Sequence, residues 1–234
     1  MKIKLVLLII IVVSIISNVY IYRRAVQAFD RYNDVRLDPL DIGDSATLSF
    51  PGQPYDFVLL GDSHASNWAI PSAAVLNLGI GGETSSQIAL RSALYAKRIS
   101  GGCLIVIAGG NDMNCLLTNK DRQETIIRQC VARIRTIVEH HRGNFTHIVV
   151  MTVPPLFSIP KEYWGLYDSS IDRSLNELNA GIRLLCAQDT SIKLLDAYEI
   201  VSKKRATENL TTDGEHLNAV AYRYLFDALR RMLM

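Results

Sequence analysis

Short apolar runs alternate with amphipathic segments along most of this 234-residue chain. Each run is at most seven residues long and is bounded by Gly, Pro, Asp or Asn, as is typical of buried parallel strands. The predicted strands are residues 57–61, 74–78, 103–108, 147–152 and 192–195. Apolar stripes at helical spacing run over residues 126–138, 171–185 and 217–229. This alternation predicts an α/β fold, a parallel sheet covered by helices on both faces.

The N-terminal end predicts a transmembrane helix in front of this fold. Residues 5–22 contain no charged side chain, and as a helix they would span about 27 Å, close to the hydrocarbon thickness of a bilayer. Tyr20 and Tyr22 suit the membrane interface, and Arg23 and Arg24 suit the polar region beyond it.

The competing interpretation of the same segment is a cleaved signal peptide, which the basic start Met-Lys-Ile-Lys favours. A small-x-small cleavage site is missing at the end of the stretch, so we expect an uncleaved anchor. The predicted organisation is an anchor over residues 1–24, a juxtamembrane tether over 25–54 and a folded domain over 55–234. Basic residues flank the stretch on both sides and barely decide its orientation. We expect the domain to be exported, on the periplasmic or extracellular side.

Charge argues against a nucleic-acid partner. The chain has 25 basic and 23 acidic residues, a net charge of +2. Four of the basic residues lie in the first 24 positions, so the rest of the chain has 21 basic against 23 acidic residues, a net charge of −2. A nucleic-acid-binding domain would be expected to carry a basic face.

In folds of this class the working residues lie in loops at the carboxyl ends of the strands. After the first predicted strand comes Gly-Asp-Ser-His, in which Ser63 is either an exposed nucleophile or the cap of the next helix. The loop after the second strand, residues 77–85, fails the dinucleotide-binding spacing because Thr84 stands where a glycine is needed. What remains there is bare glycine backbone that a ligand can approach, or an ordinary turn into a helix capped by Thr84 or Ser85.

Two further loops carry polar residues of the same kind. Asn111, after the third strand, has an amide that can donate to a developing negative oxygen, although an Asn-Asp turn explains it equally well. Asp213 and His216 precede the last helix with a spacing of three, which on a first helical turn brings both side chains to one face. A carboxylate there can accept the ring N–H and leave the other imidazole nitrogen basic. The alternative is that Asp213 merely caps the helix.

Taken in order, these four blocks closely resemble the SGNH, or GDSL-type, hydrolase family, over about residues 55–234. The resemblance implies a three-layer α/β/α sandwich with a flavodoxin-like parallel sheet. It implies Ser63 as nucleophile, His216 as base and Asp213 as its partner. The backbone N–H groups of Ser63 and Gly82 and the side chain of Asn111 would form the oxyanion hole. His64 departs from the pattern, because many members have leucine there.

The chemistry implied by this resemblance requires no metal and no organic cofactor. A rival interpretation takes Asp62 and His64 as part of a metallophosphatase motif. That chemistry needs further histidines around two metal ions, and the remaining ones, residues 140, 141, 147 and 216, fall in none of its motifs.

We therefore predict a membrane-anchored serine esterase that removes small acyl groups, acetyl above all, from cell-envelope or exported carbohydrate. The segment after the fourth strand overhangs the site, and its Phe157, Tyr163 and Trp164 are the candidate substrate-binding residues. A surface loop pinned by aromatic side chains explains them equally well. The alternatives for the whole chain are a lipid or lysophospholipid acylhydrolase, an acyltransferase with the same triad, and a non-catalytic binding module.

Overall fold

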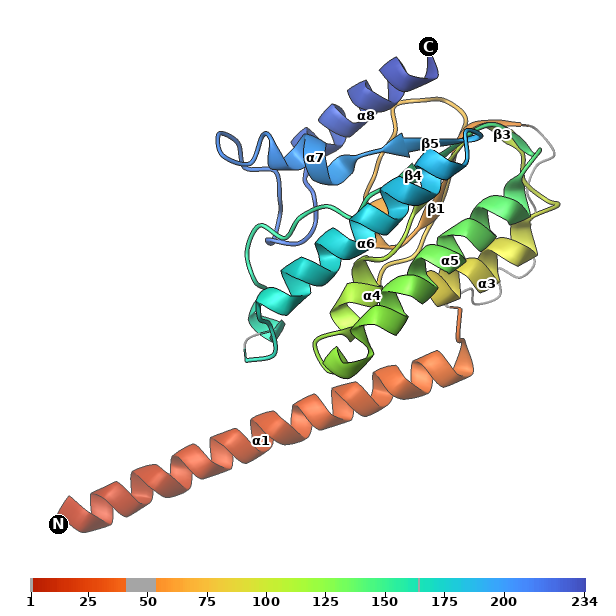
Figure 1. Ribbon diagram of the computed structural model, residues 1–234. Helices are drawn as coiled ribbons and strands as arrows, with labels where there is room; N and C mark the ends of the chain where they lie inside the picture. The colour runs from red at the N-terminus through yellow and green to blue at the C-terminus, as the bar shows by residue number, and fades with distance from the viewer. Residues whose placement is uncertain (1, 41–53, 164) are drawn as a thin grey trace. The chain divides into compact units, whose positions relative to one another are not determined.

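The computed structural model describes residues 2–40, 54–163 and 165–234 (Figure 1). The chain forms two compact units, Met1–Thr47 and Leu48–Met234. The second unit therefore begins a few residues before position 55, where the sequence placed the start of the folded domain.

The N-terminal unit contains one long helix, α1 (Lys2–Leu37). Within its segment Ile3–Asp30, an 18-residue stretch has a mean hydropathy of 2.6, and the segment is long and apolar enough to cross a membrane, as either an anchor or a signal sequence would be. The apolar side chains of this segment are exposed in the isolated chain. The helix continues into the predicted tether and ends just before Pro39, because a proline disfavours helical backbone in the residue that precedes it.

The second unit is built on a five-stranded sheet in which every pairing is parallel. All five predicted strands are confirmed, with ends shifted by at most two residues. The strand order is β2-β1-β3-β4-β5, the flavodoxin-like order. The strands are β1 (Tyr55–Gly61), β2 (Val75–Gly79), β3 (Gly101–Ile107), β4 (Phe145–Met151) and β5 (Ile192–Leu195).

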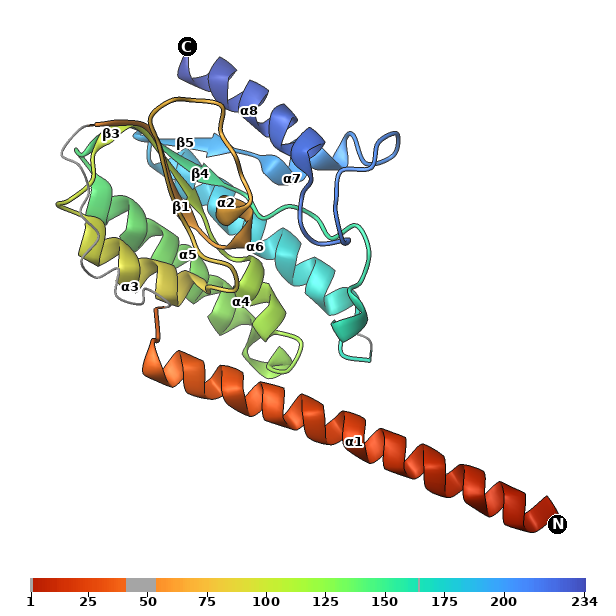
Figure 2. The same ribbon diagram turned by 180° about the vertical axis from the view of Figure 1, so that it is seen from behind.

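Helices cover both faces of the sheet, which confirms the predicted three-layer α/β/α sandwich (Figures 1 and 2). One layer contains α3 (Ser85–Tyr95), α5 (Gln123–His141) and α6 (Ser169–Gln188). The other contains α2 (Ser63–Ser66), α7 (Ala197–Ser202) and α8 (Ala219–Leu233). Shorter pieces complete the unit: α4 (Gly110–Cys115), η2 (Lys120–Arg122) and η3 (Lys161–Tyr163).

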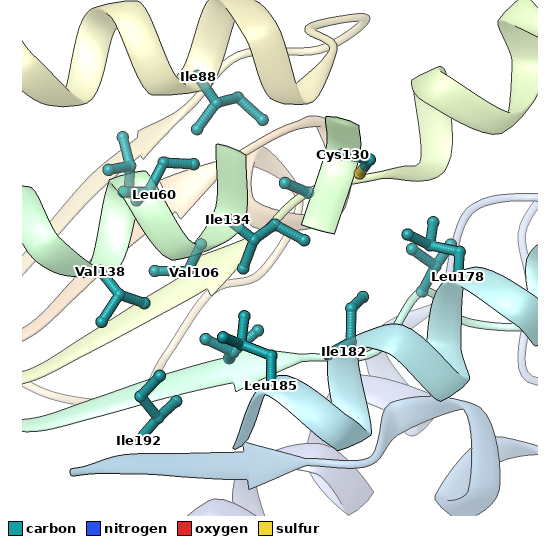
Figure 3. Packing of buried hydrophobic residues seen from close by; sticks show 14 of the residues in the cluster. Leu60, Ile88, Val106, Cys130, Ile134, Val138, Leu178, Ile182, Leu185 and Ile192 are labelled. Atoms are coloured by element: carbon teal, nitrogen blue, oxygen red, sulfur yellow. The ribbon is translucent and has the colours of Figure 1, made fainter. Parts of the chain in front are cut away.

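Strand alternation divides the buried side chains between two cores. In β3, Leu104 and Val106 point to the core shared with α3, α5 and α6, whereas Ile105 points to the core shared with α8. Figure 3 shows the first core, in which Ile134 of α5 and Ile182 of α6 face the strands. The strands are apolar on both faces, and this is why they read as continuous apolar runs in the sequence.

The connections fix where a site can form. After β2, which lies on one side of β1, the chain returns to β3 on the other side of β1. The loops that leave β1 and β3 therefore diverge at their carboxyl ends, and such a switch point is where open α/β sheets bind ligands. Ser63 follows β1 and Asn111 follows β3, so the fold brings two of the four sequence blocks to this point.

Near the amino end of β4, the burial of His141 determines how the free energy of unfolding responds to acid. Its ring is fully buried, lies edge-on to Phe145 at 5.9 Å, and neither of its nitrogens has a hydrogen-bond partner among the described residues. Burial, together with neighbouring His140, lowers the pKa of His141 to about 4. At pH values between this and the ordinary histidine pKa of about 6.5, unfolding takes up a proton, so the free energy of unfolding falls as the pH falls.

We expect His141→Leu to reduce the slope of unfolding free energy against pH by up to about 1.4 kcal/mol per pH unit near pH 5. Urea unfolding of the full-length protein in detergent, between about pH 4.5 and 6.5, measures that slope. An unchanged slope would mean that the folded protein already protonates this ring.

Candidate active site

Ser63 stands at the tip of a sharp turn between β1 and α2. The strand ends at Gly61 and the helix begins at Ser63, with Asp62 between them as the helix cap. A carboxylate oxygen of Asp62 accepts the backbone N–H of His64 at 2.9 Å. The alternative role for Ser63, capping the helix, is thus wrong, and its hydroxyl is left to other partners.

The Ser63 hydroxyl meets a histidine from the far end of the chain. His216 Nε2 lies 3.1 Å from Ser63 Oγ, and His216 Nδ1 lies 2.7 Å from Asp213 Oδ2. Because a carboxylate only accepts, Nδ1 donates to Asp213, and Nε2 is left to accept the serine proton. The three side chains form one hydrogen-bonded chain, although Ser63 and His216 are 153 positions apart in the sequence.

The environment keeps Asp213 ionised. Its partial burial acts to raise its pKa, but hydrogen bonds from the His216 ring and from the backbone N–H groups of His216 and Glu215 outweigh burial and lower the pKa to about 2. The carboxylate therefore stays negative in neutral solution, where it can stabilise a positive charge on His216.

The pair of Asp213 and His216 belongs to a tight turn, and the expected first turn of a helix is wrong. α8 begins only at Ala219, and its cap is Asn218, whose side chain accepts the N–H groups of Val220 and Ala221. A β-bridge between Thr211 and Leu217 closes the turn. A spacing of three residues is compatible with either geometry, so sequence alone could not separate them.

Gly214 lets this turn dock against the loop after β4. Its φ is +98°, and a Cβ there would lie 2.0 Å from the Ser158 hydroxyl. Its carbonyl accepts the backbone N–H of Phe157 at 2.8 Å. Any other residue would strain the backbone at this φ and would require Ser158 to shift.

The glycine-rich loop after β2 is held by a buried ion pair. Arg91 of α3 is 1% exposed and Glu83 2% exposed, and Arg91 Nε lies 3.0 Å from a Glu83 carboxylate oxygen. Arg91 also donates to the carbonyl of Leu78 at 2.7 Å. Gly82, at a φ of +84°, precedes Glu83, so the pair fixes the backbone around it. Arg91 is not among the residues expected from the sequence, because its pairing with Glu83 depends on how α3 packs against the loop.

Asn111 and its neighbour join the third block to the second. Asn111 Nδ2 donates to the carbonyl oxygen of Glu83 at 2.9 Å, which uses one of the two amide hydrogens. The buried carboxylate of Asp112 accepts both the backbone N–H and the hydroxyl of Ser85, at 2.7 and 2.6 Å. α3 itself starts at a Thr84 cap with a capping box to Gln87, as the sequence allowed. These hydrogen bonds thus join the loop after β2 to the loop after β3, although the two are separate in the sequence.

The structure distinguishes two of the three aromatic candidates for substrate binding. Tyr163 lines a surface cavity of about 510 Å³ together with Lys161, Asp213 and His216. Phe157 packs partly buried against the core on the α8 side, beneath the guanidinium of Arg205, and does not line this cavity. Trp164 lies outside the described residues.

Glu215, which the sequence analysis did not single out, ties these segments together. Its two carboxylate oxygens accept from Asn114 Nδ2 of α4 at 3.1 Å and from the Tyr163 hydroxyl at 3.2 Å. The residue lies between the two acid–base partners Asp213 and His216 in the sequence, so the same turn that presents them also anchors Tyr163 beside them.

Across the described ranges, no group of three or more His, Cys, Asp or Glu side chains is arranged to hold a metal ion. Asp62 and His64, the pair behind the phosphatase alternative, are each buried and are joined through the His64 backbone N–H.

Comparison with known protein families identifies a match over most of the chain. The profile of the GDSL-like lipase/acylhydrolase family matches residues 42–224. A search of curated protein sequences found no match.

Several solved structures share the fold at low sequence identity. A candidate platelet activating factor from Streptococcus pneumonia is 16% identical, with a TM-score of 0.68 over 90% of this chain and 99% of that one. A GDSL-like lipase from Bacteroides thetaiotaomicron is 19% identical, with a TM-score of 0.64 over 82% of this chain and 95% of that one. An acetylxylan esterase from Geobacillus stearothermophilus is 16% identical, with a TM-score of 0.57 over 78% of this chain and 95% of that one.

The ion pair that holds the glycine-rich loop should be costly to break. Glu83→Ala leaves the Arg91 charge buried without its carboxylate, and we expect the free energy of unfolding to fall by about 3–5 kcal/mol. Urea unfolding of the full-length protein measures the loss. The matched control is Glu199→Ala, which removes an exposed partner of Lys203 and should cost at most about 1 kcal/mol. Equal losses in the two variants would contradict a structural role for the buried pair.

Proposed function

The chain belongs to the GDSL-like lipase/acylhydrolase family, and on that premise we propose that Ser63, His216 and Asp213 are the catalytic triad of a serine esterase. The observation that carries the proposal is the hydrogen-bonded chain from Ser63 Oγ through the His216 ring to Asp213. In this arrangement a weak nucleophile lies next to a base, and the base is oriented by a carboxylate.

The proposed reaction follows from these contacts. His216 Nε2 takes the Ser63 proton while Oγ bonds to the ester carbonyl carbon, and the carbonyl oxygen becomes an oxyanion. As the carbon–alcohol bond breaks, His216 returns the proton to the leaving oxygen, and the acyl group stays on Ser63. Water then gives a proton to His216 as its oxygen bonds to the acyl carbon; the bond from that carbon to Ser63 Oγ breaks, His216 returns the proton to Oγ, and the acid is released. Interception of the acyl group by another alcohol in place of water would give the acyltransferase alternative.

We assign the oxyanion hole to the backbone N–H groups of Ser63 and Gly82 and the amide of Asn111. The support is that two of these donors are held in place by hydrogen bonds. Asn111 donates to the carbonyl of Glu83, the residue after Gly82, and the Glu83–Arg91 ion pair holds the loop that contains both. Donors held in place before the reaction need no reorganisation in the transition state. In well-studied hydrolases, loss of one such donor costs about 2.7–4 kcal/mol of barrier.

We propose small acyl groups, acetyl above all, on carbohydrate as the substrate class. Tyr163 beside His216 offers a ring face and a hydroxyl, a combination suited to sugars. A structural neighbour is an acetylxylan esterase, which is consistent with this class.

We further propose that α1 is an uncleaved anchor and that the catalytic unit is exported. The support is an apolar segment of sufficient length, followed by Arg23 and Arg24. A tethered esterase on the outer side would meet envelope polysaccharides rather than cytosolic esters.

Ser63→Ala should abolish labelling by a fluorophosphonate and lower kcat for p-nitrophenyl acetate by at least about a thousandfold, because the acyl-enzyme no longer forms. The matched control is Ser66→Ala, which removes the other serine of α2 and should keep both labelling and turnover. Full activity of Ser63→Ala would end the serine-esterase proposal. Faster turnover of octanoyl than of acetyl esters would instead favour the lipid acylhydrolase alternative.

Full-length protein should stay with membranes after a carbonate or high-salt wash, because burial of an apolar helix does not depend on ionic strength. A chain that starts at Ala25 should be recovered in the soluble fraction with its esterase activity. N-terminal sequencing of the mature protein decides the alternative, since a start beyond residue 20 would show a cleaved signal peptide.

A further inference from the structure

His64, next to the proposed nucleophile, has a polar ring that the triad does not use. Its side chain is 6% exposed, and its Nδ1 is buried without a hydrogen-bond partner among the described residues. The ring lies 5.8 Å from that of His216, centre to centre, at a tilt of 49°. Burial and the neighbouring His216 outweigh the opposing effect of Asp213 and lower the pKa of His64 to about 4. At neutral pH its ring is therefore uncharged, with one donor and one acceptor nitrogen.

His64 forms part of the wall of a small cavity of about 30 Å³. Gly110 forms another part, so the wall contains the chain neighbours of both the nucleophile and the proposed oxyanion donor Asn111. An acyl group carried by Ser63 with its carbonyl oxygen near Asn111 would have its remaining atoms there. A single water needs about 10–15 Å³ of such space, so the cavity has room for a short group of about two heavy atoms beyond the carbonyl region.

Most of the cavity wall is apolar, and its other polar side chains each make a hydrogen bond. Val153, Leu156, Ile171 and Leu175 supply the apolar part. The carboxylate of Glu215 accepts from Asn114 and Tyr163, and the hydroxyl of Tyr167 donates to Asp172. Among the described side chains of this wall, His64 is the one with a buried nitrogen that has no hydrogen-bond partner.

We propose that this cavity is the acyl subsite and that His64 makes it selective for a short acyl group ending in a hydroxyl, such as hydroxyacetyl, over an alkyl acyl group of equal size. This inference rests on the proposed function, because it assumes that Ser63 carries the acyl group.

The physical reason for the selectivity lies in what each group does to the buried nitrogen. A hydroxyl can donate to, or accept from, a neutral imidazole, whereas a methyl group in the same place closes the cavity and leaves that nitrogen without a partner. Sites that hydrogen-bond a substrate hydroxyl discriminate strongly against analogues lacking it, because their polar groups are then buried unpaired.

The test compares two esters of one alcohol, hydroxyacetyl and propionyl, which match in size and differ only in a terminal hydroxyl or methyl. The quantity measured is the ratio of their kcat/KM values with full-length protein in detergent, divided by the ratio of their hydroxide-catalysed rates. That division removes the higher intrinsic reactivity of the hydroxyacetyl ester. We expect a corrected ratio of at least about ten for the unaltered protein, falling to about one or below in His64→Leu.

His141→Leu is the matched control. It removes another buried histidine whose ring nitrogens have no hydrogen-bond partner among the described residues, and this histidine lies before the amino end of β4, whereas Ser63 follows the carboxyl end of β1. The corrected ratio should stay unchanged in this variant, and a fall equal to that in His64→Leu would overturn the inference.

The ratio for the unaltered protein decides the question even if His64→Leu does not fold, because a value near one overturns the inference without any variant. This outcome differs from failure of the proposed function. If hydrolysis of both esters survives Ser63→Ala, the triad assignment fails; if hydrolysis depends on Ser63 and the corrected ratio is near one, only the role of His64 fails.

Discussion

The buried ion pair between Arg91 and Glu83 is the interaction on which the rest of the site depends. Arg91 reaches from α3 to the carbonyl of Leu78 near the end of β2 and to the carboxylate of Glu83 in the following loop. An unpaired charge at such a place would be strongly destabilising, so the loop has little freedom to move away. Asn111 then donates to the Glu83 carbonyl, and the loop after β3 takes its position from the same pair.

The other segments of the site are held by the same means, a carboxylate that accepts hydrogen bonds from a neighbouring segment or from its own turn. Asp62 fixes the start of α2, Asp112 binds Ser85, and Glu215 joins α4 to Tyr163. Asp213 orders its own turn through the backbone N–H of His216 as well as orienting the ring. Fixed polar contacts of this kind give a site that is organised before substrate arrives, as electrostatic stabilisation of a transition state requires.

The sequence predicted the parts of this structure that depend on local pattern. Apolar runs located all five strands. Ser63 and Asn111 directly follow two of these runs, and the Asp213–His216 pair precedes the last helix, so their positions identified them as candidate site residues. The Arg91–Glu83 pair could not be found this way, since it joins a helix to a loop through tertiary geometry. The turn around Gly214 was mistaken for a helix start because a spacing of three serves both. The extension of α1 to Leu37 was also missed, since that segment lacks apolar periodicity.

Two histidines flank the proposed nucleophile, and their surroundings assign them different chemistry. His216 is partly exposed and donates to Asp213, whose negative charge can stabilise a proton gained from Ser63. His64 is buried, has no carboxylate bonded to its ring among the described residues, and resists protonation until about pH 4. A base must accept a positive charge during the reaction, whereas a hydrogen-bonding wall must stay neutral. The carboxylate of Asp213 suits His216 to the role of base, and burial suits His64 to the role of neutral hydrogen-bonding wall, although the two side chains are chemically identical.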